Sequence, residues 1–405
     1  LVQYKGKDSD VVIPAGIGIT KIGIKAFRKL ADVRSVTIPE GVTEICGGES
    51  DGKVWKGAFS GSGLQEVVLP ESLTTLGAGA FSDSNLKSVT VPDGVTTMLA
   101  NVFAGCKNLR QVTLGRGIKK AGDGIFQGCG LLAEVEIPPS LTNLGGVFKE
   151  CTGLVRATIP DSVTEIGGAA FFGCASLVKV TFGRKVTKIG RQAFAGCTSL
   201  KEAALPDSVT EIEGTAFKRC TALTNVTFGR KVTKIGSGAF AGCTALKEAA
   251  LPDSVTEIGE RAFSGCTSLV KAAFGRKVTK IGEEAFAGCT QLAEVTFADS
   301  AAVIGRCAFA GCTALTTVAF GSKVTAIGGE AFAGCPIEAV TLPDSLTYIG
   351  DFAFACNAME EVYIPYAVET IGECAFGKKK GVLRIRCAAS GPLPGWKSVS
   401  YTHLR

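Results

Sequence analysis

The chain has 405 residues, a hydrophobic fraction of 46% and a formal net charge of +6. No apolar run reaches the ~18 residues that a transmembrane helix needs. The charges alternate in sign instead of forming the basic stripe of a nucleic-acid-binding surface. A chain of this length usually forms two or three compact domains. Because the sequence repeats with a fixed period, we expect one array of stacked repeats instead.

A phenylalanine recurs along the chain, mostly at intervals of 22 or 23 residues, and defines 16 repeat units. Its positions are Phe27, Phe59, Phe81, Phe103, Phe126, Phe148, Phe171, Phe194, Phe217, Phe240, Phe263, Phe286, Phe309, Phe332, Phe354 and Phe376. The first interval is 32 residues because of an insertion at about residues 46–55. Its Gly, Ser and Asp content predicts a surface loop. The loop is either a tolerated insertion or a functional loop with Glu49, Asp51 and Trp55 as candidate residues.

One repeat unit, residues 193–212, shows what each coil contains. Ala203 and Leu205 alternate with polar or small residues, which predicts a short strand with one buried face. Pro206 ends that strand because proline cannot donate a further ladder hydrogen bond. Residues 209–212 predict a second short strand, and the Ala-Phe-x-Gly-Cys segment predicts a third wall of 3₁₀ or irregular turn. Stacked coils of this kind predict a solenoid of mainly parallel β-strands, with phenylalanine on phenylalanine.

The central repeats also form a double repeat, because residues 183–214 and 229–260 match at 27 of 32 positions. Acidic and basic residues alternate from coil to coil at two positions of this block. At the first position stand Asp161, Arg184, Asp207, Arg230, Asp253, Arg276 and Asp299, and at the second Glu165, Lys188, Glu211, Lys234, Glu257 and Lys280. We expect each acid to pair with a base in the adjacent coil and to fix the order of the coils. The alternative is a patterned docking surface.

The repeat motif L-x-x-V-x-L/I-P-x-S/G-V-T-x-I-G-x-x-A-F-x-G-C resembles the BspA-like class of leucine-rich repeats. It is visible in Leu177–Cys197, Leu200–Cys220 and Leu246–Cys266, and the resemblance covers about residues 11–387. Members of the class are typically microbial or protist surface proteins that bind host or matrix proteins. The resemblance therefore implies a leucine-rich-repeat solenoid over residues 1–387, a cell-surface or secreted location, and a protein ligand. It also implies that residues 388–398 close the solenoid.

Sixteen cysteines are the most conspicuous reactive groups. Twelve recur with the repeat, at Cys106, Cys129, Cys151, Cys174, Cys197, Cys220, Cys243, Cys266, Cys289, Cys312, Cys335 and Cys356. No CxxC pair has a matching partner pair or histidine, so we predict no metal site and no cofactor. Buried thiols pack as small hydrophobes, and we expect reduced packing cysteines. Cys374 and Cys387, outside this series, are candidates for a disulfide at the end of the array.

No catalytic constellation can be assembled, and the chain is predicted not to be an enzyme. The single histidine, His403, lies in residues 399–405 (VSYTHLR), which match one reading frame of a common sequencing adapter. We expect this tail to be a read-through artefact. Carboxylates are plentiful, but each occupies a repeating surface position, whereas a catalytic pair needs two different environments at one unique place.

The outward side of the first strand is the predicted partner-binding face. Its candidate residues are Lys179, Glu202, Asn225, Glu248, Lys271 and Glu294, beside a row of Thr and Ala. We expect one continuous parallel sheet, flat and without aromatic anchors. The prediction is a non-enzymatic protein-binding or adhesion solenoid. The alternatives are a spacer or intracellular scaffold, or the repeat region of a larger receptor or enzyme.

Overall fold

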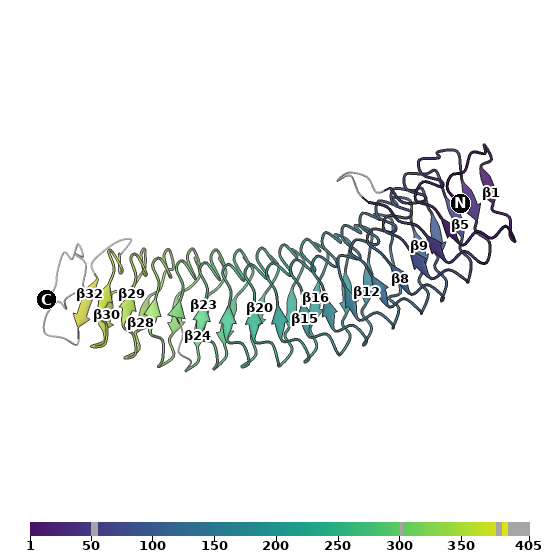
Figure 1. The fold of residues 1–405 in the computed structure, drawn as a ribbon. Helices are drawn as coiled ribbons and strands as arrows, with labels where there is room; N and C mark the ends of the chain where they lie inside the picture. The colour runs from purple at the N-terminus through teal and green to yellow at the C-terminus, as the bar shows by residue number, and fades with distance from the viewer. Residues whose placement is uncertain (50–55, 300–302, 378–382, 388–405) are drawn as a thin grey trace. The chain divides into compact units, whose positions relative to one another are not determined.

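The computed structural model describes residues 1–49, 56–299, 303–377 and 383–387. Over these ranges the chain is a parallel β-solenoid of about 16 turns, and no helix occurs in them. Figure 1 shows the repeated coils, each carrying short strands. Residues 1–200 and 201–405 form two compact units, which we describe one at a time. The predicted closing segment, 388–398, and the predicted adapter tail, 399–405, lie outside the described residues.

In unit 1 each coil contributes a strand to one of two walls, or to both. The first wall contains β1 (Asp10–Val12), β3 (Ser35–Thr37), β5 (Glu66–Val68), β7 (Ser88–Thr90), β9 (Gln111–Thr113), β12 (Arg156–Thr158) and β14 (Lys179–Thr181). The second wall contains β2 (Lys21–Ile22), β4 (Glu44–Ile45), β6 (Thr75–Leu76), β8 (Thr97–Met98), β10 (Lys120–Ala121), β11 (Asn143–Leu144), β13 (Glu165–Ile166) and β15 (Lys188–Ile189).

Unit 2 repeats this arrangement. Its first wall contains β16 (Glu202–Ala204), β18 (Asn225–Thr227), β20 (Glu248–Ala250), β22 (Lys271–Phe274), β24 (Glu294–Phe297), β26 (Thr317–Ala319), β28 (Ala339–Thr341), β30 (Glu361–Ile364) and β32 (Arg384–Cys387). Its second wall contains β17 (Glu211–Ile212), β19 (Lys234–Ile235), β21 (Glu257–Ile258), β23 (Lys280–Ile281), β25 (Val303–Ile304), β27 (Ala326–Ile327), β29 (Tyr348–Ile349) and β31 (Thr370–Ile371).

The two walls of unit 2 differ in continuity, and this corrects one expectation. The second wall forms one uninterrupted parallel ladder from β17 to β31. The first wall, predicted to be a single continuous sheet, is divided into β16–β18, β20–β28 and β30–β32. The break after β28 accompanies a shortened connection. Ile337 N–H donates to Cys335 O, two residues earlier, at 2.9 Å. In the preceding coil the equivalent Leu315 N–H donates to Cys312 O, three residues earlier.

The core is a stack of phenylalanines, as the period predicts. Within unit 2, Phe240 lies between Phe217 and Phe263, with ring centroids 5.2 Å away on both sides and interplanar angles of 3° and 9°. All three side chains are fully buried. The inward residue of each first-wall strand, such as Ala249, completes the core, while its two neighbours in the strand face outward.

The third wall is a run of tight turns and not the 3₁₀ segment allowed for. Cys243 N–H bonds to Phe240 O at 3.1 Å within the coil, and Phe240 N–H bonds to Ala262 O of the next coil at 2.7 Å. Each bond from coil to coil interrupts the succession of turns, so no continuous 3₁₀ helix forms. Gly242 has φ +73°, a left-handed conformation that glycine adopts without strain.

The corner after the first strand shows the double repeat. From residue 205 to residue 275 the coils end their first strand alternately with Leu-Pro and Phe-Gly, as at Leu205-Pro206 and Phe228-Gly229. A Cβ atom at Gly229 would overlap the Pro206 carbonyl oxygen. The bulk instead lies one residue earlier, where Phe228 packs edge-on against Phe240 at 5.6 Å. A Pro corner can also follow a Pro corner, as Pro365 follows Pro343, so the alternation is a property of these coils and not of every Pro corner.

The cysteine series is buried, with one correction. Eleven of the twelve predicted cysteines are buried, and the Cys243 thiol, for example, contacts Phe217 O at 3.2 Å as a weak donor. Cys356 is exposed and has φ 65°, because it occupies the position that glycine holds in the preceding coils. Asn357 takes the buried position and donates to Phe354 O at 2.7 Å. All 16 cysteines are free thiols, so the candidate Cys374–Cys387 disulfide is not formed.

Candidate protein-binding surface

The candidate residues of unit 2 lie at outward positions of neighbouring strands. Glu202, Asn225, Glu248 and Lys271 are exposed, and Glu294 is partly exposed. The register places Glu202 opposite Asn225 and Lys271 between Glu248 and Glu294. We call these five residues, with the outward Thr and Ala row beside them, the strand face. The row consists of Ala204, Thr227, Ala250, Ala273 and Thr296.

The charges of the strand face are partly paired with one another. Lys271 Nζ lies 3.3 Å from Glu294 Oε2, and both side chains are about half exposed, at 54% and 47%. An ion pair this exposed contributes little to stability, typically ~0.2–1 kcal/mol. The pair therefore holds the two side chains against the sheet without removing them from solvent.

The other candidate residues lie elsewhere. Lys179 is exposed on β14 of unit 1. Glu49, the first residue of the candidate loop, is also exposed, whereas Asp51 and Trp55 lie outside the described residues. The structure places neither Lys179 nor Glu49 in the strand face of unit 2.

The predicted pairing of acids and bases between coils is present in both units. In unit 1, Arg184 bonds to Asp161 through its backbone N–H at 2.7 Å and through two guanidinium nitrogens at 2.7 and 2.9 Å. These bonds lower the pKa of Asp161. In unit 2, Asp207 accepts the backbone N–H of Arg230 at 2.9 Å. The aspartate of this pair thus binds the backbone N–H of the following coil in addition to attracting its guanidinium group.

Two aromatic residues near the end of unit 2 escaped the sequence analysis. Tyr363 is 54% exposed and Tyr366 is 76% exposed. Tyr363 is an outward residue of β30, so the first wall does carry an aromatic side chain beyond the central coils. Extending the repeat alignment past residue 300 would have found it, because Tyr363 falls at the position of Thr341.

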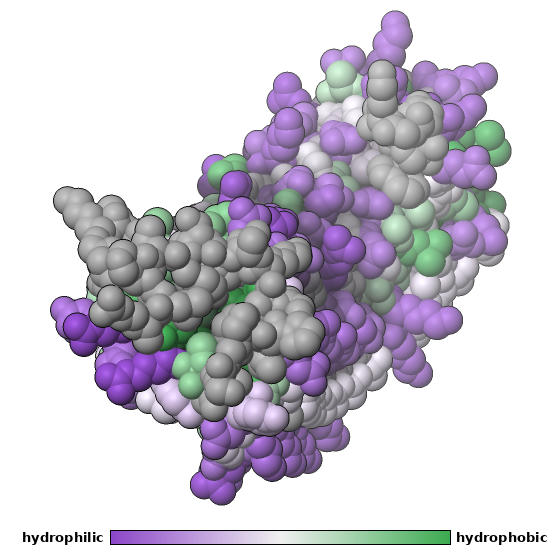
Figure 2. Space-filling view, turned by 90° about the vertical axis from the view of Figure 1, so that its left-hand side faces the viewer, coloured by the Kyte–Doolittle hydropathy of each residue, from purple (hydrophilic) through white to green (hydrophobic). Residues whose placement is uncertain are grey.

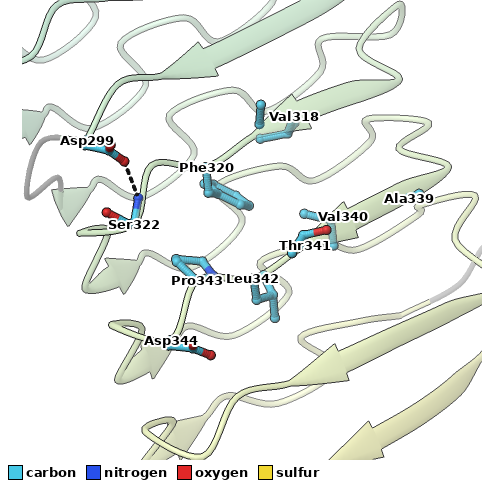
Figure 3. Close-up of a pocket in the computed structure, with 11 residues that line it drawn as sticks. Asp299, Val318, Phe320, Ser322, Ala339, Val340, Thr341, Leu342, Pro343 and Asp344 are labelled. Carbon is cyan, nitrogen blue, oxygen red and sulfur yellow. Dashed lines mark hydrogen bonds between the residues drawn. The ribbon is translucent and has the colours of Figure 1, made fainter.

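A groove with a volume of ≈ 680 Å³ lies beside the ends of β26 and β28. Figure 3 shows Asp299, Ser322 and Asp344 along one side of it, with Phe320, Pro343 and Leu342 next to them. Asp299 accepts the backbone N–H of Ser322 at 3.0 Å. Hydrogen bonds from Ser322 lower the pKa of Asp299, so its carboxylate is ionised at neutral pH. The groove thus combines an apolar floor with an acidic rim.

The remaining surface offers little other chemistry. Among the described residues, no group of three or more His, Cys, Asp or Glu is arranged to hold a metal ion. Burial raises the pKa of Cys106 to about 12, which removes the thiolate that a nucleophile or a metal ligand requires. In the part of the chain that the structure describes, no helix is long and apolar enough to cross a bilayer. Figure 2 shows hydrophilic residues over much of the face that it displays.

Short parallel strands, two walls and a phenylalanine stack define a leucine-rich-repeat solenoid. The family model described as a BspA type leucine-rich repeat region matches residues 4–48, 52–178, 145–270 and 279–389, and the chain belongs to this family. Proteins with this repeat and this fold are typically non-enzymatic and generally bind other proteins.

Solved structures of bacterial leucine-rich repeat proteins are similar to this chain. A leucine-rich repeat protein from Bacteroides ovatus is 25% identical over 94% of this chain and 84% of that chain, with a TM-score of 0.63. One from Eubacterium ventriosum is 22% identical over 91% and 86% of the two chains, with a TM-score of 0.48. A leucine-rich cell surface protein from Faecalibacterium prausnitzii is 26% identical over 71% and 87%, with a TM-score of 0.37. Comparison with curated proteins gave no match.

Proposed function

We propose that this chain is a non-enzymatic adhesion solenoid that binds a protein partner along the strand face of unit 2. The observation that carries the proposal is the five-stranded sheet β20–β28, whose outward residues are small or charged. Ala250, Ala273 and Ala319 leave the backbone of this sheet open to close approach by another protein.

The charges of the strand face favour a protein over a polyanion. Glu248, Lys271 and Glu294 alternate in sign along the stack, so a partner with its own alternating charges is complementary. No aromatic residue lies at an outward position of β16–β24, which leaves the strand face without the usual hot-spot anchor. Each coil then contributes little, and affinity comes from several coils engaged together. We expect weak, salt-sensitive binding.

The proposed location is the cell surface or the secreted fraction, with a host or matrix protein as ligand. The support for this is family membership. A role as a spacer or an intracellular scaffold predicts the same fold but no partner on the strand face. The two functions therefore differ in one measurable property, which is binding by this sheet.

A charge-reversal experiment tests the proposal. The full chain is immobilised and its binding to a panel of purified matrix proteins is measured by biolayer interferometry at two salt concentrations. Reversing Glu202, Glu248 and Lys271 together should weaken binding about tenfold, a change of ~1.4 kcal/mol. Reversing Glu211 and Lys234, which lie on the second wall of the same unit, is the matched control and should leave binding unchanged.

Two outcomes would count against the proposal. If the second-wall variant lost binding and the strand-face variant kept it, the wrong wall has been chosen. If no matrix protein bound the native chain at either salt concentration, the spacer role would take its place.

A further inference from the structure

The corner that follows each first-wall strand carries a charged row that is regular in most of unit 2 and then changes. The row runs through Asp207, Arg230, Asp253, Arg276, Asp299, Ser322, Asp344 and Tyr366. Up to Asp299 each aspartate is followed by an arginine in the next coil. Asp299 is followed by Ser322 and Asp344 by Tyr366, so the corresponding arginine is missing twice in succession.

The consequence is a more negative corner than in the regular coils, because the arginine of the following coil is missing. Asp299 keeps the bond to the backbone of the following coil, at 3.0 Å from Ser322 N, but receives no guanidinium from that coil. Arg276 in the preceding coil and Lys323 are the bases whose charges reach Asp299. Asp344 is exposed, and Tyr366 stands in the next coil where the regular coils have an arginine. Two carboxylates therefore flank a serine at a place where the repeat provides a base.

The groove opens at the same corner. Its floor is formed by Phe320, Leu342 and Pro343. Val340, the inward residue of β28, is partly exposed, whereas its counterpart Val318 is buried at 6%. This exposed apolar surface coincides with the end of the sheet at β28. The volume of ≈ 680 Å³ lies within the usual range for a binding pocket, ~300–1,000 Å³.

We propose that this groove binds a segment of a partner protein in which an arginine stands next to an apolar side chain, the arginine occupying the corner beside Ser322 between Asp299 and Asp344. The inference shares with the proposed function only the premise of a protein partner, and it concerns a different surface of unit 2.

Three features of the site select this ligand. The guanidinium group binds carboxylates through a planar fork of donors, as Arg184 does at Asp161 within the chain. Tyr366 stands in the next coil of the row, beyond the lining of the groove, and is 76% exposed; an aromatic ring of this kind attracts a cation that extends past Asp344. The adjacent apolar side chain covers the partly exposed Phe320 and Val340. An acidic segment would instead meet two like charges.

The test uses a peptide array. Each peptide has a central arginine between two variable residues, and a matched array carries citrulline, which is nearly isosteric but uncharged. The labelled full chain should be retained by arginine peptides with apolar neighbours and not by their citrulline counterparts. Retention that is equal on both arrays, or absent from both, would overturn the proposal.

Three variants then locate the site for the strongest peptide, by fluorescence anisotropy. Ser322→Arg restores the repeat and places the chain's own guanidinium in the corner, so it should weaken binding at least tenfold. Asp344→Asn should weaken it severalfold. Arg230→Ser is the matched control, because it places a serine between Asp207 and Asp253 where no groove is found, and it should change nothing. Unchanged binding by Ser322→Arg, or new binding by Arg230→Ser, would contradict a groove-specific site.

Two further measurements test whether a loss of peptide binding comes from unfolding of the variant or from binding at the strand face. Melting temperatures should be equal or higher for Ser322→Arg, which only supplies the residue type found in the regular coils. The variant with Glu202, Glu248 and Lys271 reversed should bind the peptide as the native chain does. Loss of peptide binding in that variant would place the peptide on the strand face and overturn the groove site, while leaving the proposed function intact.

Discussion

The regular coils of unit 2, residues 201–297, and the irregular coils that follow, residues 309–377, share one backbone plan but differ at their surface. In the regular coils the Pro and Gly corners alternate, and aspartates face arginines. In the irregular coils Ser322 and Tyr366 replace the arginines, and Asn357 replaces a cysteine. The first-wall ladder is interrupted after β18 in the regular coils and again after β28 in the irregular coils. The comparison teaches that the regular coils pair their corner aspartates with arginines of the next coil, whereas the coils of Ser322 and Tyr366 leave corner carboxylates without that arginine.

The largest expected effect concerns alkaline pH and the buried thiols of unit 1 and of the regular coils of unit 2, in contrast to the exposed Cys356 of the irregular coils. Burial raises the pKa of the cysteines at the repeat position, to about 12 for Cys106, Cys151 and Cys289, against ~8.5 for a free thiol. Above about pH 8.5 the unfolded chain loses these protons and the folded chain keeps them, so stability is complete below that pH and falls as the pH rises. Each thiol contributes ~1.4 kcal/mol per pH unit. Urea denaturation between about pH 8 and 10.5 measures the slope.

The exposed Cys356 supplies the matched control for this prediction. Replacing Cys106, Cys151 and Cys289 by alanine should flatten the pH slope, and Cys356→Ala, which removes an exposed thiol, is the comparison. In the native protein Cys356 should react with iodoacetamide well before the buried thiols. Equal slopes for the two variants would show that the buried thiols do not account for the alkaline loss of stability.

A smaller effect is expected from cutting the phenylalanine stack. Phe240→Ala in the regular coils should cost ~3–5 kcal/mol, the usual range for a buried aromatic. Phe376→Ala should cost less, because Phe376 is 6% exposed and stacks on one described ring, Phe354, at 5.3 Å. Denaturant unfolding measures both. Since coils couple mainly to their neighbours, hydrogen exchange should speed up around Phe240 first, and a uniform increase along the chain would refute that coupling.

The smallest loss of stability is expected from Asn357→Ala. This variant tests whether the hydrogen bonds of Asn357 stabilise the irregular coils in place of the buried cysteine of the regular coils. Asn357 donates to Phe354 O at 2.7 Å and accepts from Met359 N–H at 2.8 Å while buried. Asn357→Ala leaves these groups unpaired and should cost ~1–3 kcal/mol. Cys243→Ala is the comparison in the regular coils and should cost less, because a thiol is a weak donor. A larger loss at Cys243 than at Asn357 would reverse this ranking.

The sequence by itself determined the coil. The period of Phe240 and its counterparts, the alternation at Glu202–Leu205 and the corner at Pro206 depend on contacts that recur in every repeat, so composition and spacing are sufficient to predict them. The outward position of Glu248 and Lys271 follows from the same alternation, and the pairing of Asp207 with Arg230 follows from stacking.

Only the tertiary structure decided where the coils depart from the regular pattern of hydrogen bonds and burial. The series of cysteines assigned Cys356 to the buried position, but Cys356 occupies the left-handed position that glycine holds in the preceding coils, and Asn357 takes the buried one. The end of the sheet at β28 and the groove beside Phe320 depend on whether backbones in adjacent coils stay within hydrogen-bond distance. That distance is set by the combined fit of three coils, including the shortened connection at Ile337, and no single repeat encodes it. The acidic rim of the groove, at Asp299 and Asp344, is a candidate site because Phe320 and Val340 remain partly exposed beside it.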